Sequence, residues 1–233
     1  MGANGEDAIV WHEGDMPFST RFGDHFYSRE NGLAETRHVF IAGNRLLERW
    51  QAQNNFHIGE LGFGTGLNML TTWQAWKAQR RSGQHLTFTS FEKFPLDGET
   101  LARALANWPE LADEVAALIA VWPQPKPLED LVVDLDDGVR LQLLIGDAAA
   151  RLTAWDGSAD AWYLDGFAPA RNPDMWSADL LGAVFDKTKP GGTFATYAAA
   201  GFVRRNLQAA GFTVERLAGH GMKREMLAGT RTA

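Results

Sequence analysis

The sequence predicts an α/β fold with a mostly parallel sheet flanked by helices. Two observations predict it. From about Phe56 onward, apolar strand-like runs alternate with helix-like segments, and the first of these runs leads into a glycine-rich turn at residues 62–66. Parallel neighbouring strands need crossover helices, so this alternation is typical of a parallel sheet. A glycine turn between a strand and a helix is a common ligand site in such folds.

Each element has its own local signal. Seven apolar runs predict core or closing strands at residues 56–61, 85–91, 139–146, 161–165, 193–197, 212–217 and 224–229. Residues 131–147 read as a hairpin that turns at Asp137-Gly138, and residues 189–192 read as a turn. Helices are expected to begin near Gly66, Asp97, Glu110, Asp147, Asp174 and Ala199. The first 55 residues fit this rhythm less well, so we expect residues 1–55 to form an N-terminal cap or extension of the same domain as residues 56–233.

Composition limits the classes of function. The 233 residues suit one domain, and 45% apolar and 22% charged residues are typical of a globular protein. No apolar run approaches the length of a membrane span, so we expect no membrane contact and a cytoplasmic location. The chain has no cysteine, which excludes disulfides, thiolate metal sites and cysteine nucleophiles. The net charge of −7 argues mildly against a nucleic-acid partner, although a local basic face can coexist with it.

The glycine turn and two later acidic residues suggest a nucleotide-like ligand. The spacing is G-x-G-x-G, unlike the G-x-G-x-x-G of a dinucleotide site, which disfavours NAD. Glu92 ends the next strand, where a carboxylate can accept hydrogen bonds from both ribose hydroxyls. Asp147 follows a later strand and can either cap the next helix or face an adenine. A structural turn and solvated carboxylates are the simpler alternatives.

These motifs together resemble the class I S-adenosylmethionine-dependent methyltransferases. The resemblance implies a Rossmann-like, seven-stranded, mostly parallel sheet with a small insertion, and S-adenosylmethionine as the cofactor, with no metal. By motif position and neighbourhood, it implies these cofactor-binding residues: Glu60, Gly62, Gly64, Gly66, Asn68, Glu92, Lys93, Asp147, Ala148 and Asp165.

The stretch from Asp165 to Pro169 is the candidate acceptor side. It places a carboxylate, an aromatic ring and a proline directly after a strand, at the sheet edge where ligands bind in open α/β folds. Methyl transfer is an in-line displacement, so the enzyme must aim the lone pair of its acceptor. We expect Asp165 to orient a neutral amine and stabilise the positive charge that develops on its nitrogen, with a cation–π contact from Phe167. The simpler alternative is that Asp165 caps a loop and Phe167 belongs to the core.

Longer stretches resemble a narrower family. Residues 26–40, 60–68 with 89–96, 165–177 and 219–227 are similar to the tRNA 5-methylaminomethyl-2-thiouridine methyltransferases, the MnmD family, which also forms the N-terminal half of a bifunctional enzyme. The resemblance implies N-methylation of the 5-aminomethyl group on the wobble uridine, with the tRNA anticodon arm as partner. It also implies no FAD, because the oxidase half is absent from these 233 residues. The implied substrate-binding residues are Tyr27, Ser28, Glu30, Asn31, Pro169, Lys223 and Arg224.

Two alternatives remain at this point. A class I methyltransferase for a small-molecule amine would suit the acidic net charge, and a module that binds without chemistry would suit the fold alone. The absence of cysteine disfavours methylation of a pyrimidine carbon, which normally uses a thiolate.

Overall fold

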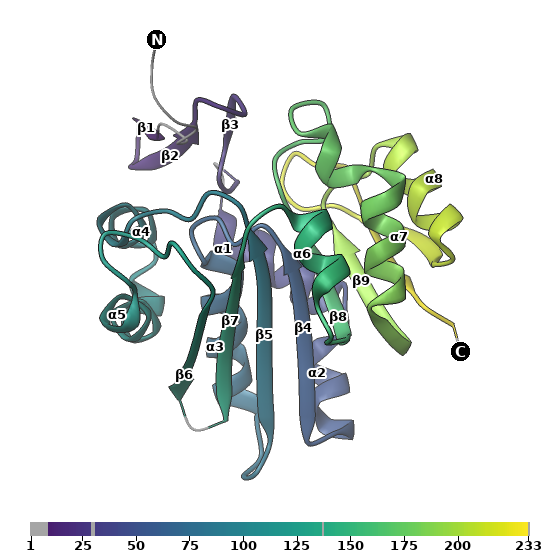
Figure 1. Ribbon diagram of the computed structural model, residues 1–233, viewed down its shortest axis with the longest axis horizontal. Helices are drawn as coiled ribbons and strands as arrows, with labels where there is room; N and C mark the ends of the chain where they lie inside the picture. Colours follow the sequence, from purple (N-terminus) through teal and green to yellow (C-terminus); the bar gives the residue numbers. More distant parts are fainter. Residues whose placement is uncertain (1–8, 29–30, 137, 233) are drawn as a thin grey trace.

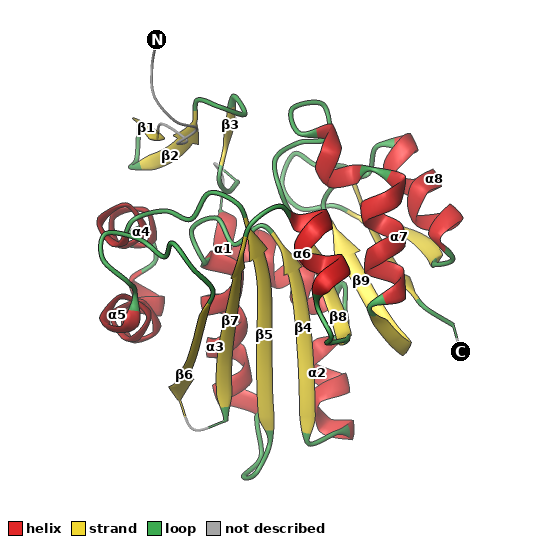
Figure 2. Ribbon diagram, viewed as in Figure 1, coloured by secondary structure: helices red, strands yellow, loops and turns green. Residues whose placement is uncertain are grey.

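The computed structural model describes residues 9–28, 31–136 and 138–232, which form two sheets (Figure 1). The strands of the larger sheet are β4 (Asn55–Leu61), β5 (His85–Glu92), β6 (Leu131–Asp136), β7 (Val139–Ile145), β8 (Ala159–Leu164), β9 (Thr188–Thr196), β10 (Thr213–Ala218) and β11 (Glu225–Thr230). The smaller sheet has β1 (Ile9–His12), β2 (Met16–Ser19) and β3 (Asp24–His25). It lies beyond the carboxyl ends of the central strands (Figure 2).

The larger sheet runs in the order β10-β11-β9-β8-β4-β5-β7-β6. Its centre, from β9 to β7, is parallel, whereas β11 is antiparallel to both β9 and β10, and β6 is antiparallel to β7. The predicted mostly parallel fold is confirmed. The sheet has eight strands, one more than the expected seven, because the first arm of the expected hairpin pairs along β7 as β6.

The helices begin close to the expected residues. They are α1 (Gly32–Glu35), α2 (Leu46–Arg49), α3 (Leu67–Gln79), α4 (Gly98–Leu105), α5 (Ala112–Val121), α6 (Ala148–Ala154), α7 (Ala178–Asp186) and α8 (Gly201–Ala210). A π-helix, η1 (Thr36–Ala42), follows α1 directly, and short 3-10 helices form η2 (Trp50–Ala52), η3 (Pro109–Leu111) and η4 (Pro173–Trp176). Asp97 and Asp147 accept hydrogen bonds from the first turns of α4 and α6, which is why these helices begin there. Near Asp174 the chain first makes η4, and Ser177 then caps α7.

Helices cover both faces of the larger sheet and create two hydrophobic cores. Alternation along β8 shows the division, because Trp162 packs with the α6–α8 side and Tyr163 packs with the α3 side. Trp73 and Trp76 of α3 are buried in the latter core. The N-terminal segment contributes Trp50 to the same core, so it packs against the sheet as well as extending over its end.

The first half of β9 differs from the prediction. Residues 189–192 were expected to be a turn, but they lie within β9. The pairing of β9 with β8 shifts from Thr188 to Thr193 across this segment, and Gly191 has φ +73°, so the expected turn is a bulge inside the strand. In the hairpin of β6 and β7, Gly138 has φ +84°, as a tight turn requires, while Asp137 lies outside the described residues.

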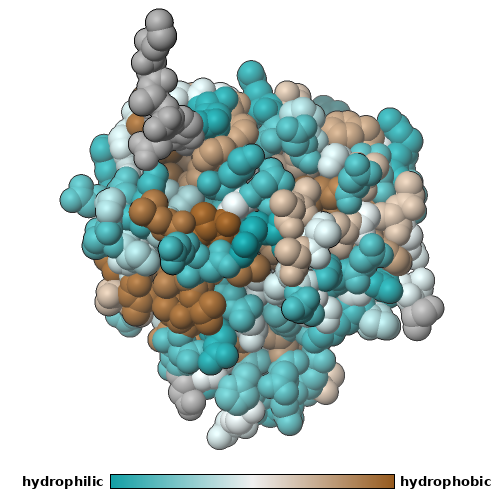
Figure 3. All heavy atoms as spheres, in the orientation of Figure 1, coloured by the Kyte–Doolittle hydropathy of each residue, from teal (hydrophilic) through white to brown (hydrophobic). Residues whose placement is uncertain are grey.

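Exposed apolar side chains gather over α5 and β6, on the left of the view (Figure 3). Leu128, Val132 and Val121 are exposed there, and none of them lines the cavity described below. Among the described residues, no helix has the length and apolar character needed to cross a membrane.

Candidate active site

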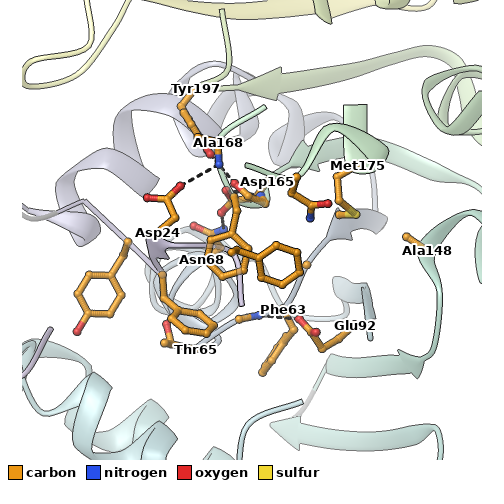
Figure 4. A pocket seen from close by; sticks show the side chains of 18 of the residues that line it. Asp24, Phe63, Thr65, Asn68, Glu92, Ala148, Asp165, Ala168, Met175 and Tyr197 are labelled. Carbon is orange, nitrogen blue, oxygen red and sulfur yellow. Dashed lines mark hydrogen bonds between the residues drawn. The ribbon is translucent and has the colours of Figure 1, made fainter. Parts of the chain in front are cut away.

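A cavity of about 910 Å³ lies beyond the carboxyl ends of the central strands. The turns that follow β4, β5, β7 and β8 form its floor, and residues of the N-terminal segment and of the β10–β11 turn close its sides. Figure 4 shows Asp165 and Tyr197 toward one end of the cavity and Phe63 and Glu92 toward the other. The strand-end positions therefore converge as expected for an open α/β sheet.

The glycine turn joins β4 to α3 through three left-handed residues. Gly62, Gly64 and Gly66 have φ values of +84°, +54° and +78°, which only glycine adopts without strain. Gly62 and Gly64 line the cavity, whereas Gly66 does not. Gly66 lies against the ring of Phe63, where a Cβ atom would come within 2.9 Å. The first two glycines therefore leave room for a ligand, and the third packs the turn.

Glu92 lies directly beside this turn. Its carboxylate accepts hydrogen bonds from the backbone N–H groups of Gly64 at 3.0 Å and Phe94 at 2.6 Å. Burial raises the pKa of Glu92, and these N–H groups oppose the rise by favouring the charged form. Each carboxylate oxygen can accept more than one hydrogen bond, so Glu92 retains capacity for ligand hydroxyls.

Lys93, Asp147 and Ala148 line the same part of the cavity. Asp147 accepts from Ala150 N–H at 3.4 Å and forms an ion pair with Lys93 at 3.1 Å. The hydrogen bond from Lys93 lowers the pKa of Asp147. Asp147 therefore caps α6 and also lies on the cavity wall, and its contact with an adenine stays a prediction.

Asn68, in the first turn of α3, links two carboxylates. Its Nδ2 donates to Glu60 Oε1 at 3.0 Å and to Asp165 Oδ2 at 2.7 Å, and its Oδ1 lies 2.7 Å from the hydroxyl of Thr36. Ser90 donates to the other oxygen of Glu60 at 2.7 Å. Glu60 is fully buried and does not line the cavity, so it lies behind Asn68 rather than beside a ligand. Burial raises the pKa of Glu60 well above its ordinary range.

Asp165 is one of the titratable groups at the end of the cavity where Tyr197 lies (Figure 4). Burial raises its pKa from 3.8 to about 6, while hydrogen bonds from Gly166 N–H at 2.8 Å and from Asn68 limit the rise. The charge of Glu35 also raises this pKa, and that of Lys223 lowers it. A carboxylate with a pKa near 6 is charged at neutral pH but accepts a proton readily.

An aromatic wall faces Asp165. The ring of Phe167 stacks on Phe22 with centroids 4.5 Å apart and meets the edge of Phe26 at 5.2 Å. Phe22 also approaches Phe94, at 6.2 Å. Phe167 therefore lines the cavity with rings from the N-terminal segment instead of entering the core.

A hydrogen bond connects the N-terminal segment to the loop at residues 165–169. Asp24 of β3 accepts from the backbone N–H of Ala168 at 3.0 Å (Figure 4). Tyr27 lines the cavity near its hydrogen bond to Ala104 O at 3.1 Å, and Ser28 lines it as well. Burial raises the pKa of Tyr27 to about 12, so its hydroxyl stays protonated.

The remaining expected substrate residues divide between several places. Asn31 caps α1 by accepting from Ala34 N–H at 2.9 Å and does not line the cavity, and Glu30 lies outside the described residues. Pro169 and Arg224 line a shallower neighbouring depression of about 590 Å³. Lys223 lines both hollows.

Lys223 is not a free surface cation. Its Nζ lies 2.6 Å from Glu35 Oε1 and 3.7 Å from the centroid of the Tyr197 ring. The Tyr197 hydroxyl donates to the carbonyl of Gly166, which fixes the ring beside Asp165. Burial raises the pKa of Tyr197 well above its ordinary value, and the charge of Asp165 adds to the effect.

A family model described as S-adenosyl-L-methionine-dependent methyltransferase matches residues 109–232, more than half of the chain. The chain belongs to this family. The matched region of the methyltransferase includes Asp147, Asp165 and Lys223, while the glycine turn precedes it.

Curated relatives resemble the methyltransferase over nearly its whole length. Two of them carry the name tRNA 5-methylaminomethyl-2-thiouridine biosynthesis bifunctional protein MnmC. The relative from Methylobacillus flagellatus is 51% identical over 227 residues, which cover 97% of this chain and 35% of the relative. The relative from Pseudomonas aeruginosa is 48% identical over 225 residues, covering 95% and 34%. The chain therefore spans about a third of the length of these relatives.

Solved structures share the fold of the methyltransferase. MNMC2 from Aquifex aeolicus matches with a TM-score of 0.75 and 22% sequence identity over 99% of this chain and 72% of that chain. A precorrin-6y C5,15-methyltransferase from Geobacter metallireducens matches with a TM-score of 0.51 and 11% identity over 97% and 94%. These likenesses confirm the expected class I methyltransferase fold.

Sequence reasoning did not single out several residues of the methyltransferase cavity. Asp24, Glu35 and Tyr197 all line the cavity together with Asp165. Tyr197 follows β9 directly, and position at a strand's carboxyl end is a signal that could have found it. Asp24 and Glu35 belong to the N-terminal part of the chain, and no short-range sequence pattern predicts that they line the cavity.

Proposed function

We propose that this methyltransferase transfers a methyl group from S-adenosylmethionine to the 5-aminomethyl nitrogen of a tRNA wobble uridine. The product would be 5-methylaminomethyluridine, on a plain or 2-thiolated base. The proposal takes its substrate from the names of the MnmC relatives. The observation that carries its chemistry is the Asp165 carboxylate, held in the cavity between the glycine turn and the aromatic wall.

The residues of the cavity fit the cofactor. Gly62 and Gly64 leave the floor beside Glu92 free of side chains, Glu92 can accept from ribose hydroxyls, and Asp147 and Ala148 extend the wall where an adenine would lie. When bound, S-adenosylmethionine supplies an electrophilic methyl group on a positively charged sulfur. In this proposal Asn68 positions Asp165 through its hydrogen bond, and Glu60 positions Asn68 in turn. Glu60 does not contact the ligand itself because it does not line the cavity.

Asp165 would orient the amine and receive its charge. The bound cofactor would supply the methyl group, and Asp165 would hold the neutral amine nitrogen with its lone pair toward that group. The nitrogen then carries a positive charge, which the Asp165 carboxylate stabilises and from which it can take a proton. Phe167 presents a ring beside the same position for a cation–π contact.

The aromatic wall suits an unpaired base. An anticodon loop presents its wobble base without a partner strand, so extrusion into the cavity costs less than flipping from a duplex. Phe22 and Phe167 offer stacking surfaces at the cavity side. We propose the anticodon arm as the partner, with Arg224 beside the cavity as a phosphate contact, and the cytoplasm as the location. No metal is needed for this chemistry, and FAD is not proposed.

Nucleoside mass spectrometry tests the proposal. The protein is incubated with S-adenosylmethionine and tRNA carrying 5-aminomethyluridine, and the expected result is a new 5-methylaminomethyluridine peak that disappears in Asp165→Ala. Cofactor binding by calorimetry checks that the variant remains loaded. Methylation of free amines but not of tRNA would instead select a small-molecule acceptor, and full activity of Asp165→Ala would refute the proposed role of the carboxylate.

A further inference from the structure

The acceptor end of the cavity already holds a primary ammonium group, that of Lys223. Its Nζ forms an ion pair with Glu35, whose side chain is only 11% exposed, while the lysine side chain is 38% exposed. The face of Tyr197 lies 3.7 Å from the same nitrogen. A carboxylate and an aromatic face are the groups that recognise an organic ammonium ion.

The surroundings of this ammonium belong to the acceptor site. The Tyr197 hydroxyl is bound to the carbonyl of Gly166, next to Asp165, and Glu35 and Lys223 both act electrostatically on the Asp165 carboxyl. Glu35, Tyr197 and Asp165 therefore form one acidic, aromatic-sided receptor, which we call the ammonium receptor. The aminomethyl group of the proposed substrate, when protonated, is chemically the same primary ammonium as the end of a lysine side chain. It would arrive in this form and lose one proton to solvent before its nitrogen accepts the methyl group.

We propose that Lys223 is an internal stand-in for the substrate's amine, which displaces it from Glu35 and Tyr197 on binding. The inference rests on the proposed function for the identity of the displacing group, an aryl-linked CH₂NH₃⁺. It makes Glu35 and Tyr197 acceptor-binding residues. It makes Lys223 a specificity residue, because a ligand without a cation gains nothing by displacing the lysine.

The β10–β11 turn permits this exchange. Lys223 N–H donates to His220 O at 3.0 Å and Gly219 N–H donates to Arg224 O at 3.1 Å, so the turn is short and closed on itself. Met222 at its tip is 86% exposed, so the tip carries little packing that would oppose movement. A displaced Lys223 would remain at the cavity mouth, close to an arriving RNA backbone.

The alternative role for Lys223 is a simple phosphate contact, and Arg224 provides the matched control. Arg224 is the exposed neighbour outside the main cavity, so Arg224→Met removes one positive charge from the same turn without opening the ammonium receptor. Lys223→Met removes the charge and keeps much of the apolar stem. A phosphate contact predicts weaker RNA binding in both variants, whereas a stand-in predicts tighter amine binding in Lys223→Met and no change in amine binding in Arg224→Met.

The first experiment measures binding of benzylammonium, an aryl-linked CH₂NH₃⁺, by calorimetry with the 233-residue protein. We expect Lys223→Met to bind it about tenfold more tightly than the wild type, because the competing cation is gone. Arg224→Met should bind it like the wild type, and the double variant Glu35→Gln/Lys223→Met should lose most of the gain. Equal affinity in wild type and Lys223→Met would overturn the inference, and Lys223→Gln repeats the test if the first variant melts at a lower temperature.

The second experiment compares two synthetic anticodon stem-loops, one with 5-aminomethyluridine and one with uridine at the wobble position, in the presence of S-adenosylhomocysteine. The affinity ratio between them should rise about tenfold in Lys223→Met and stay unchanged in Arg224→Met. A ratio that stays unchanged or falls in Lys223→Met, with methylation intact in the wild type, would overturn the stand-in. If Lys223→Met binds benzylammonium more tightly but the wild type does not methylate tRNA, the ammonium receptor is supported and the proposed tRNA substrate is rejected.

Discussion

Replacing Asn68 by leucine should uncouple Asp165 from the buried carboxylate behind it. Leucine has nearly the shape of asparagine but cannot donate to Asp165 at 2.7 Å or to Glu60 at 3.0 Å. The charged form of Asp165 would lose a stabilising hydrogen bond, so its pKa should rise further above about 6.

The size of the change follows from the strength of that bond. A hydrogen bond to a charged group contributes roughly 1.5–3 kcal/mol, and one pKa unit corresponds to about 1.4 kcal/mol. The Asp165 pKa should therefore rise by about 1–2 units in Asn68→Leu. Since the proposed reaction needs the charged carboxylate, activity is lost as pH falls through this pKa, and the variant should lose it at a higher pH than the wild type.

The assay is the pH dependence of kcat/KM for tRNA methylation. Ser90→Ala is the matched control, because Ser90 donates to Glu60 at 2.7 Å and makes no contact with Asp165 that would be lost. Both variants should lower the melting temperature, but only Asn68→Leu should shift the acid limb of the kcat/KM profile to higher pH. An unmoved acid limb in Asn68→Leu, or the same upward shift in Ser90→Ala, would refute the reasoning.

Three further changes test other parts of the site. Burial raises the folded-state pKa of Glu60 above its ordinary 4.5, so the wild type loses stability as pH rises from about 4.5 toward the raised value. Over that range, thermal denaturation should show the melting temperature of Glu60→Gln rising relative to that of the wild type. A difference in melting temperature that does not change with pH would contradict this. Glu92→Gln should weaken S-adenosylmethionine binding about tenfold in calorimetry through loss of a charged acceptor, and an unchanged Kd would remove Glu92 from the ribose site. Phe22→Leu removes the ring that stacks on Phe167 at 4.5 Å and should lower kcat/KM for tRNA about tenfold while cofactor affinity stays the same; a parallel fall in cofactor affinity would assign the ring to the cofactor instead.

Local patterns in the sequence were sufficient for the parts of the site that follow single strands. Glu92 and Asp165 were predicted because each ends an apolar run, and the carboxyl ends of parallel strands meet at one edge. Caps at Asp97 and Asp147 were equally local. Residues 189–192 misled the prediction because proline and glycine also occur in bulges, and only the pairing with β8 distinguishes a bulge from a turn.

The features of the site that the sequence did not predict depend on contacts between segments far apart in the chain. Glu60 was expected to touch the cofactor, yet its place behind Asn68 follows from how α3 packs on β4. The ion pair between Lys223 and Glu35 joins residues 188 positions apart, so neither side chain alone indicates it. The same holds for Asp24, which reaches Ala168 across 144 positions. Such pairs are set by tertiary packing, which periodicity and turn signals do not encode.

The place of β11 between β9 and β10 has a consequence for biosynthesis. A nascent chain leaves the ribosome with β10 before β11, so β10 has no partner in the sheet until the last strand is made. Until then the open edge of β9 offers unpaired backbone groups to other chains. Met226 and Ala228 fill one core and Leu227 fills the other, so both cores are completed by the same late insertion. Chaperones that shield strand edges during synthesis should therefore raise the yield of this protein.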